Sequence, residues 1–393
     1  MEFRGDSPNI SLEAVKANAV FSDVYRFFDI TIAMKSDREY MLAWFRRLYP
    51  RFRQENANEK ADATYYMMYG TLGEAFVVAE ENSHLETRSA GNQHSAIFYA
   101  SLLVSNYIAG NMKSHFLLHG AAISYNGNGM AIAGPSYYGK TSLTLQLLLR
   151  KGFRFLSDDQ LAINRATHLV DPFPRGIGIR ENTLAFFDEL ELEHLESSMD
   201  SGGQRKWLVD ISEISENGLG KTCRLRYLVF LVNSLDETEK SEQHIELTLD
   251  EINDKLLEKF RSIARNGEIR CRYMGSFYAV SFQPEAEALD VLEIEHVCES
   301  YGVWLLGVRK FSNDEPDFSL TPRIQPISWH EAVMELLKGL QNDFRGAPLP
   351  TFLELAGILE EVECYKLSVG KLDEMGEHIS NLVLNSDRPC VNF

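Results

Sequence analysis

Hydrophobic and polar positions change their spacing several times along the chain, and each change predicts a new helix or strand. In the first hundred residues, stretches with a period of two alternate with stretches whose apolar residues recur every three or four positions. The first predicted helix begins at a capping-box sequence, Ser36-Asp37-Arg38-Glu39. The predicted strands cover residues 29–34, 65–68 and 75–79, and the predicted helices cover 41–48 and 96–108. Together they indicate a small α+β domain.

The segment from residue 117 to residue 163 has the pattern of a strand, a loop, a helix and further strands. Two apolar stretches, LLHGAAIS and MAIAG, have the character of strands, and Asn126-Gly127 between them favours a tight hairpin. The helix after the loop has leucines on several sides, as a buried helix does, and Gly152 ends it. The strand FRFL then leads to two aspartates and another strand. This order is typical of an α/β nucleotide-binding core.

The remaining chain continues to mix strand-like and helical patterns. Strand-like stretches are GIGI, KWLVDI and RYLVFLV, while residues 249–265 and much of the tail from Ser328 have helical spacing. We therefore expect a mixed α/β (α+β) protein of three parts. They are an N-terminal α+β domain at residues 1–108, a nucleotide-binding domain at 109–315 and a mostly helical C-terminal segment at 316–393.

Composition changes this picture mainly through charge. The chain has 393 residues, of which 45% are hydrophobic and 24% charged, as in an ordinary globular protein. Asp and Glu number 57 against 39 Lys and Arg, which gives a net charge of −18. Such an acidic surface repels phosphodiester backbones and anionic lipid, so neither nucleic acid nor a membrane is expected as the main partner. A local basic pocket can still hold a small anion such as a nucleotide.

The cysteines and the apolar segments indicate a cytoplasmic protein. The five cysteines lie far apart and form no C-x-x-C pair, so neither a disulfide framework nor a zinc knuckle is expected. The N-terminal residues lack the basic and apolar regions of a signal peptide. No apolar run reaches the roughly 18 residues of a membrane-spanning helix.

One stretch matches the phosphate-binding motif G-x-x-x-x-G-K-[ST]. A predicted strand precedes it and a predicted helix follows it, so the N-terminus of that helix would also attract an anion. Lys140 would bridge the terminal phosphates of ATP, and the Thr141 hydroxyl would bind Mg²⁺. An ordinary strand-to-helix turn is the alternative. The predicted nucleotide-binding residues are Gly134, Pro135, Ser136, Tyr137, Tyr138, Gly139, Lys140, Thr141 and Ser142.

Two carboxylates and a histidine complete the candidate chemistry. Asp158 and Asp159 follow the next strand, where one carboxylate could hold Mg²⁺ and the other could accept a proton from an attacking hydroxyl. Without the loop before them, adjacent aspartates are more often a turn or a helix cap. His119 precedes the loop on a predicted strand, and a single histidine on a strand is usually structural.

Together these residues resemble the catalytic core of the bacterial HPr kinase/phosphorylase family. The similar features are the His-Gly at residue 119, the glycine-rich loop, the two aspartates and a later stretch, Arg175-Gly176-Ile177-Gly178-Ile179, which is similar to the family's signature loop. The match runs from His119 to about Ile179, and the flanking sequences are only loosely similar.

The resemblance implies a role for each matching residue. The loop would bind the phosphates of ATP, Thr141 would ligate Mg²⁺ with Asp159 beside the metal, and Asp158 would deprotonate a substrate serine. His119 would contact Asp158, and Arg175 would hold phosphate or substrate. The implied fold is a P-loop domain like that of phosphoenolpyruvate carboxykinase. The resemblance leaves a homo-oligomer open.

Three positions depart from the family pattern. Tyr137 replaces a glycine of the loop, and a left-handed backbone there would cost a tyrosine on the order of 1–2 kcal/mol. Gln160 replaces an arginine, and Phe173 stands where the family has a metal-binding glutamate. The absence of that glutamate argues against a second metal site and against the reverse, phosphorolytic reaction.

The predicted function is an ATP-dependent kinase that phosphorylates a serine of a peptide or protein. Some HPr-kinase-like proteins phosphorylate serine in ribosomally made peptides, including lasso-peptide precursors, and this chain is similar to them in outline. A small-molecule kinase and a nucleotide-binding regulatory module without phosphotransfer are the alternatives. In so acidic a chain we expect Lys140, Arg175 and Arg180 to gather in one cleft, with surplus carboxylates elsewhere, partly in Glu181–Asp200.

Overall fold

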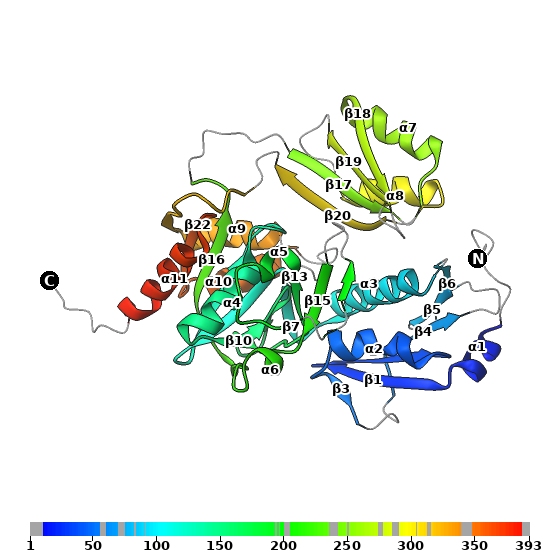
Figure 1. Cartoon of the computed structure of the whole chain (residues 1–393), viewed down its shortest axis with the longest axis horizontal. Coiled ribbons are helices and arrows are strands. Elements are labelled where there is room, and N and C mark those ends of the chain that lie inside the picture. The colour runs from blue at the N-terminus through cyan, green and yellow to red at the C-terminus, as the bar shows by residue number, and fades with distance from the viewer. Residues whose placement is uncertain are drawn as a thin grey trace. The chain divides into compact units, whose positions relative to one another are not determined.

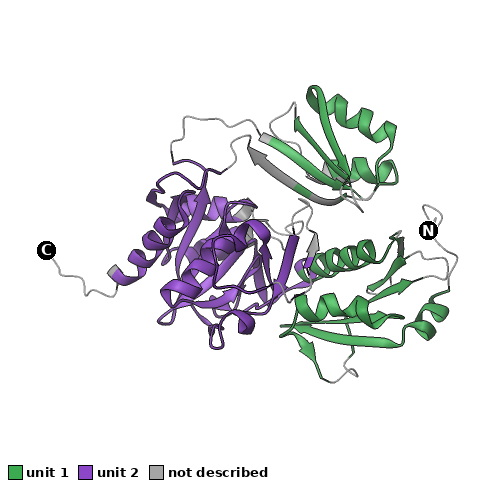
Figure 2. Ribbon diagram, in the orientation of Figure 1, with its two compact units in different colours: residues 1–108, 199–204, 240–313 green, residues 109–198, 205–239, 314–393 purple. Residues whose placement is uncertain are grey.

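A computed structural model of the chain contains two compact units (Figure 2). The first comprises residues 1–108, 199–204 and 240–313, and the second comprises residues 109–198, 205–239 and 314–393. The structure describes residues 11–386 apart from 56–59, 70–74, 82–83, 91, 193–194, 196, 200–204, 236–242, 250, 274–277, 285–290, 304, 313–315 and 339–347. Both units combine helices with sheets, which confirms the predicted mixed α and β class.

The N-terminal part of the first unit is a sheet of order β3-β1-β2-β4-β5-β6 (Figure 1). Its strands are β1 Phe21–Phe27, β2 Ile30–Ser36, β3 Arg53–Gln54, β4 Ala63–Tyr69, β5 Ala75–Glu81 and β6 His84–Ser89, and its helices are α1 Leu12–Asn18, α2 Glu39–Leu48 and α3 Gln93–Asn111. The predicted capping box at α2 is wrong. Ser36 pairs with Met67 across β2 and β4, and its hydroxyl donates to the Met67 carbonyl at 2.6 Å. The helix begins only at Glu39, with Arg38 as its N-cap and no side-chain cap.

The first unit also contains a separate sheet of order β18-β19-β17-β20. Its elements are β17 Gln243–Leu249, α7 Asp254–Ile263, β18 Ala264–Tyr273, β19 Tyr278–Pro284, α8 Val291–Ser300 and β20 Leu305–Ser312. This βαββαβ order with antiparallel neighbours is the split βαβ arrangement, and it has its own apolar core around Leu247, Phe260 and Val280. The predicted boundaries place these residues inside the nucleotide-binding domain, so they differ here from the compact units.

The second unit is built on a mixed sheet of order β10-β8-β9-β16-β12-β11-β7, with β22 beside β16 and β21 beside β22. Its strands are β7 His115–Leu118, β8 Gly120–Tyr125, β9 Asn128–Ala133, β10 Arg154–Ser157, β11 Leu161–Asn164, β12 Leu169–Asp171, β16 Cys223–Val232, β21 Ile324–Ile327 and β22 Glu363–Ser368. Strand β9 is antiparallel to β8 and parallel to β16. Because β21 and β22 belong to this sheet, the predicted C-terminal segment is part of the same unit as the phosphate loop.

Helices cover both faces of this mixed sheet. Along β9, Met130 and Ile132 pack in the cluster that contains α4 Lys140–Lys151 and α11 Leu372–Ser386, whereas Ala131 and Ala133 pack in the cluster that contains α9 Trp329–Lys338 and α10 Pro348–Leu359. Four of the five leucines of α4 are buried and Leu149 is partly buried, which confirms the predicted buried helix. Among the helices that the structure describes, none has both the length and the apolar character needed to span a bilayer.

A small sheet of order β13-β15-β14 packs on the same side of the mixed sheet as α4. Its strands are β13 Ile177–Arg180, β14 Ser197–Met199 and β15 Arg205–Val209, and the short helices α5 Glu181–Leu184 and α6 Ile211–Ile214 follow β13 and β15. Ile177, Ile179, Trp207 and Val209 pack into the same apolar cluster as α4. The alternate residues of β13 and β15 are therefore directed away from this core.

Candidate active site

The glycine-rich loop joins β9 to α4, and both motif glycines are needed for its shape. Gly134 has φ +146°, and a Cβ there would lie 2.9 Å from the Leu231 carbonyl oxygen of β16. Gly139 has φ +81° and is the N-cap of α4. Tyr137 also has a left-handed backbone, with φ +70°, a conformation in which a tyrosine is strained. Its ring lies over the Arg180 guanidinium, 4.4 Å from ring centre to carbon.

This strain can be measured by comparing Tyr137→Gly with Tyr137→Ala. Both variants lose the ring over Arg180, but only alanine keeps the steric cost of the left-handed backbone. We expect denaturant titrations to give the glycine variant the higher free energy of unfolding, by about 1 kcal/mol. This difference already includes the opposing effect of glycine, which loses more backbone entropy on folding than alanine does. At an ordinary helical or extended position alanine would be the more stable variant, and that order here would contradict the strain.

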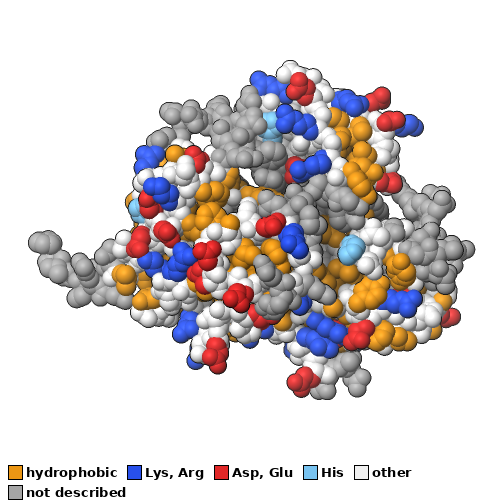
Figure 3. Space-filling view, in the orientation of Figure 1, with side chains coloured by type: hydrophobic (Ala, Val, Ile, Leu, Met, Phe, Trp, Pro, Cys, Tyr) orange, Lys and Arg blue, Asp and Glu red, His pale blue; other side chains and the backbone are white. Residues whose placement is uncertain are grey.

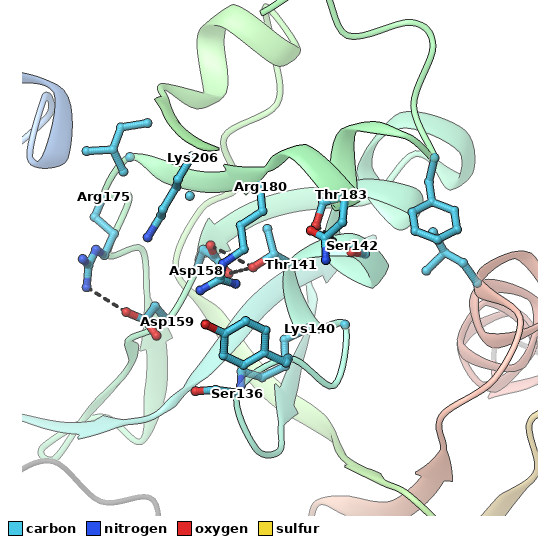
Figure 4. Close-up of a pocket in the computed structure, with 18 of the residues that line it drawn as sticks. Ser136, Lys140, Thr141, Ser142, Asp158, Asp159, Arg175, Arg180, Thr183 and Lys206 are labelled. Carbon is cyan, nitrogen blue, oxygen red and sulfur yellow. Dashed lines mark hydrogen bonds and ion pairs between the residues drawn. The ribbon is translucent and has the colours of Figure 1, made fainter. Parts of the chain in front are cut away.

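A cavity of about 440 Å³ opens at the N-terminus of α4 (Figure 4). It is of the size of small-molecule sites. Of the predicted nucleotide-binding residues, those that line it are Ser136, Tyr137, Gly139, Lys140, Thr141 and Ser142. Gly134 and Pro135 shape the loop behind it, and the Tyr138 side chain packs in the apolar core instead.

Lys140 is buried at the base of this cavity. Its Nζ donates to the carbonyl oxygens of Gly134 at 2.7 Å and Pro135 at 2.9 Å. Burial lowers the pKa of the Lys140 ammonium group, and the charges of Asp159 and Asp158 oppose this shift. The lysine therefore holds the ends of the loop together while its charge faces the carboxylates.

The two aspartates have different partners. The Thr141 hydroxyl donates to the Asp158 carboxylate, at 3.2 and 3.3 Å from its two oxygens. Asp159 lies 3.2 Å from His119 Nδ1 and accepts a hydrogen bond from Arg175 at 3.1 Å. The predicted contact between His119 and Asp158 is therefore wrong. Asp159 has φ +72°, which turns the chain after β10 and directs the second carboxylate, not the first, to the histidine.

These partners separate the pKa values of the two carboxyl groups. Burial raises the pKa of Asp158 above its ordinary value, and the charge of Asp159 adds to this shift. Enclosure also opposes the ionisation of Asp159, but the hydrogen bond from His119 and the charge of Arg175 hold the pKa of Asp159 well below its ordinary value. Asp158 is thus the more basic of the pair.

The structure adds a cation that the sequence patterns did not indicate. Lys206, on β15, pairs across the small sheet with Arg180 of β13, and both line the cavity. A Cβ at Gly178 would collide with Lys206 Cε, so the glycine leaves the space that the lysine side chain occupies. Enclosure lowers the pKa of the Lys206 ammonium group, a shift that a bound phosphate would oppose. The sequence signal for Lys206 is the alternation of KWLVDI: because Trp207 and Val209 lie in the core, Lys206 faces the opposite side of the strand.

The cavity is locally cationic. Four cationic side chains, Lys140, Arg175, Arg180 and Lys206, line it with two carboxylates, in a chain whose net charge is −18. On the face of the molecule in Figure 3, by contrast, acidic and basic side chains are interspersed. Of the acidic stretch Glu181–Asp200, only Asn182, Thr183 and Phe186 line the cavity among the described residues. An anionic ligand is therefore favoured at this site.

The two other departures from the family pattern are buried. Phe173 is fully buried, and its N–H donates to the Leu156 carbonyl oxygen at 2.9 Å beside β10. Gln160 is also buried. Neither is among the described residues that line the cavity. Within the described ranges, no cluster of three or more His, Cys, Asp or Glu residues could hold a metal ion.

Comparisons with known proteins give little beyond this geometry. No family model matches the chain, and no curated protein matches it. One solved structure that it is similar to is the Hpr(Ser) kinase/phosphatase from Coxiella burnetii, at 12% identity over 47% of this chain and 90% of that chain, with a TM-score of 0.20. A likeness this weak carries no argument about fold or activity, so the resemblance to that family and its specific fold stay predictions.

Proposed function

We propose that this chain is an ATP-dependent phosphotransferase that transfers the γ-phosphoryl group to a serine hydroxyl of a peptide or protein. One observation carries the proposal: a cationic cavity at the N-terminus of a buried helix, where a glycine loop and its lysine face two aspartates with separated pKa values. A phosphate loop alone would serve any nucleotide-binding module. A basic carboxylate beside it is the feature that favours transfer to a hydroxyl.

The residues would divide the work of phosphoryl transfer. Lys140 and the loop N–H groups would hold the β- and γ-phosphates, and Arg175 and Lys206 would neutralise charge as the phosphoryl group moves. The serine oxygen forms a bond to the γ-phosphorus, the bond from that phosphorus to the β–γ bridging oxygen breaks, and ADP leaves. Asp158 takes the proton of the serine hydroxyl, and His119 with Arg175 would keep Asp159 ionised.

The cavity has donors that fit Mg²⁺. Mg²⁺ in such sites is bound by one or two carboxylates, with substrate phosphates and water completing its shell. The Thr141 hydroxyl and the Asp159 carboxylate would hold it here, and both line the cavity. When bound, Mg²⁺ would supply charge neutralisation on the phosphates.

Intact-mass analysis tests the proposed transfer. The purified chain, ATP and Mg²⁺ are incubated with serine-containing peptides and, separately, with small alcohols. A matched peptide set has each serine replaced by alanine. We expect one phosphoryl group to be added to a serine peptide and none to its alanine counterpart. ATP binding without a phosphorylated product would instead indicate a regulatory module, and products formed only from small alcohols would indicate a small-molecule kinase.

A further inference from the structure

The cavity has two ends of opposite chemical character. Arg175 and Lys206 point toward the two aspartates at one end, and Ser142 and Thr183 lie at the other (Figure 4). Besides Leu208, which lies on β15 two residues after Lys206, the described residues that line the cavity include three large apolar side chains, Phe186, Phe318 and Leu372. The proposed phosphotransfer chemistry uses none of these three.

Phe318 covers the end of the phosphate loop. A Cβ at Gly139 would lie 3.0 Å from Phe318 Cε1, so the ring edge rests against the glycine α-carbon at the start of α4. The ring is only partly buried, although it packs against the apolar cluster of the unit. An aromatic side chain that touches the loop therefore also faces the cavity.

Phe186 and Leu372 belong to two segments that Arg150 of α4 holds beside this helix. The Arg150 guanidinium of α4 donates to the Phe186 carbonyl oxygen at 3.0 Å and to the Asp373 carboxylate at 3.3 Å, next to Leu372. Phe186 is nevertheless 47% exposed, so its ring retains an open surface toward the cavity that it lines.

We infer that this apolar end binds the purine base of the nucleotide, with Phe318 as the ring on which the base stacks. The inference rests on the proposed function, because that function sets the direction of the ligand. The γ-phosphate must lie by Asp158 and the cations for transfer, so the uncharged end of ATP extends the other way. A flat aromatic ring is the ligand group that gains most from stacking on phenylalanine. Stacking is tolerant of base identity, so adenine and guanine both fit.

The experiment compares a ligand that has a base with one that has none. Calorimetry measures the dissociation constants of Mg²⁺-bound AMP-PNP, a non-hydrolysable ATP analogue, and of Mg²⁺-bound tripolyphosphate. The proteins are the wild type, Phe318→Ala, Phe318→Tyr and Leu320→Ala, the last a 53% exposed apolar residue of the same segment that does not line the cavity. Phe318→Ala should weaken AMP-PNP binding by about 5- to 100-fold. Its tripolyphosphate affinity, and both affinities of the other variants, should stay close to wild type.

Each other outcome is decisive. If Phe318→Ala leaves AMP-PNP affinity unchanged, or weakens both ligands equally, the base does not stack on this ring and the inference falls while the proposed function stands. If the wild type binds tripolyphosphate but gains nothing from the base, the apolar end has another use. If the wild type binds neither ligand, the proposed function itself fails, and the base site fails with it.

Discussion

Replacing Asp158 with asparagine is expected to lower phosphoryl transfer by about 10²- to 10⁴-fold, the contribution of a positioned general base. Asparagine keeps the size of the side chain and an oxygen that can accept the hydrogen bond from Thr141, so the loop should hold its shape. The affinity for Mg²⁺-bound AMP-PNP should therefore stay close to wild type. Rates of product formation and calorimetric titrations of the same protein would measure both quantities.

Two further substitutions show whether Asp158 is the base. Asp159→Asn should raise the Mg²⁺ concentration that half-maximal activity requires, whereas Asp158→Asn should leave that requirement unchanged at its lower rate. Asp188→Asn, at an exposed aspartate that does not line the cavity, should behave as wild type. Transfer retained by Asp158→Asn, with loss confined to Asp159→Asn, would move the base to the second carboxylate.

The pH dependence of activity is a second test of Asp158 as the base. A base must be deprotonated to act, and burial raises the pKa of Asp158 above its ordinary value of 3.8. Activity of the wild type should thus fall as the pH drops through this raised pKa, and the fall should begin above the range in which an exposed aspartate titrates. An acid limb near the ordinary value would argue for a carboxylate that is not buried.

The phosphate loop could be predicted from the sequence because its determinants are local. Two glycines with left-handed or unusual backbones, a strand that ends just before Gly134 and a helix whose C-cap is Gly152 all lie within about twenty residues. The Asn126-Gly127 hairpin is readable for the same reason, since its positive φ angles are a property of those two residues. Where a short segment sets its own conformation, pattern and structure agree.

The partners of the site could not be read in this way because they depend on tertiary pairing. Lys206 reaches the cavity only because β15 pairs with β13 and because Gly178 has no side chain. Which aspartate meets His119 depends on one positive φ angle at Asp159, which neighbouring residues do not reveal. Phe318 comes from a polar connector, whose apolar residue has no periodic pattern to mark it.

The domain boundaries show the same limit on a larger scale. The elements from β17 to β20 form a sheet with its own core, although β16, which precedes them in the chain, and β22, which follows later, are neighbours in one sheet. An insertion of this kind cannot be recognised from the amino-acid composition, because both parts alternate strands and helices. The parallel pairing of β16 with β22 then joins the C-terminal residues to the phosphate-loop unit.

Replacing Lys140 with methionine is expected to lower kcat/KM by about 10²- to 10³-fold, the range for removal of one preorganised group that stabilises transition-state charge. Methionine fills much of the buried space but cannot donate to the phosphates or to the carbonyls of Gly134 and Pro135. Lys151→Met, at the other end of α4, is the matched control and should retain activity. Lys140→Arg should not rescue the rate, since the buried site holds a compact ammonium and a planar guanidinium would displace the loop. Activity within a few-fold of wild type in Lys140→Met would mean that this loop does not hold the transferred phosphate.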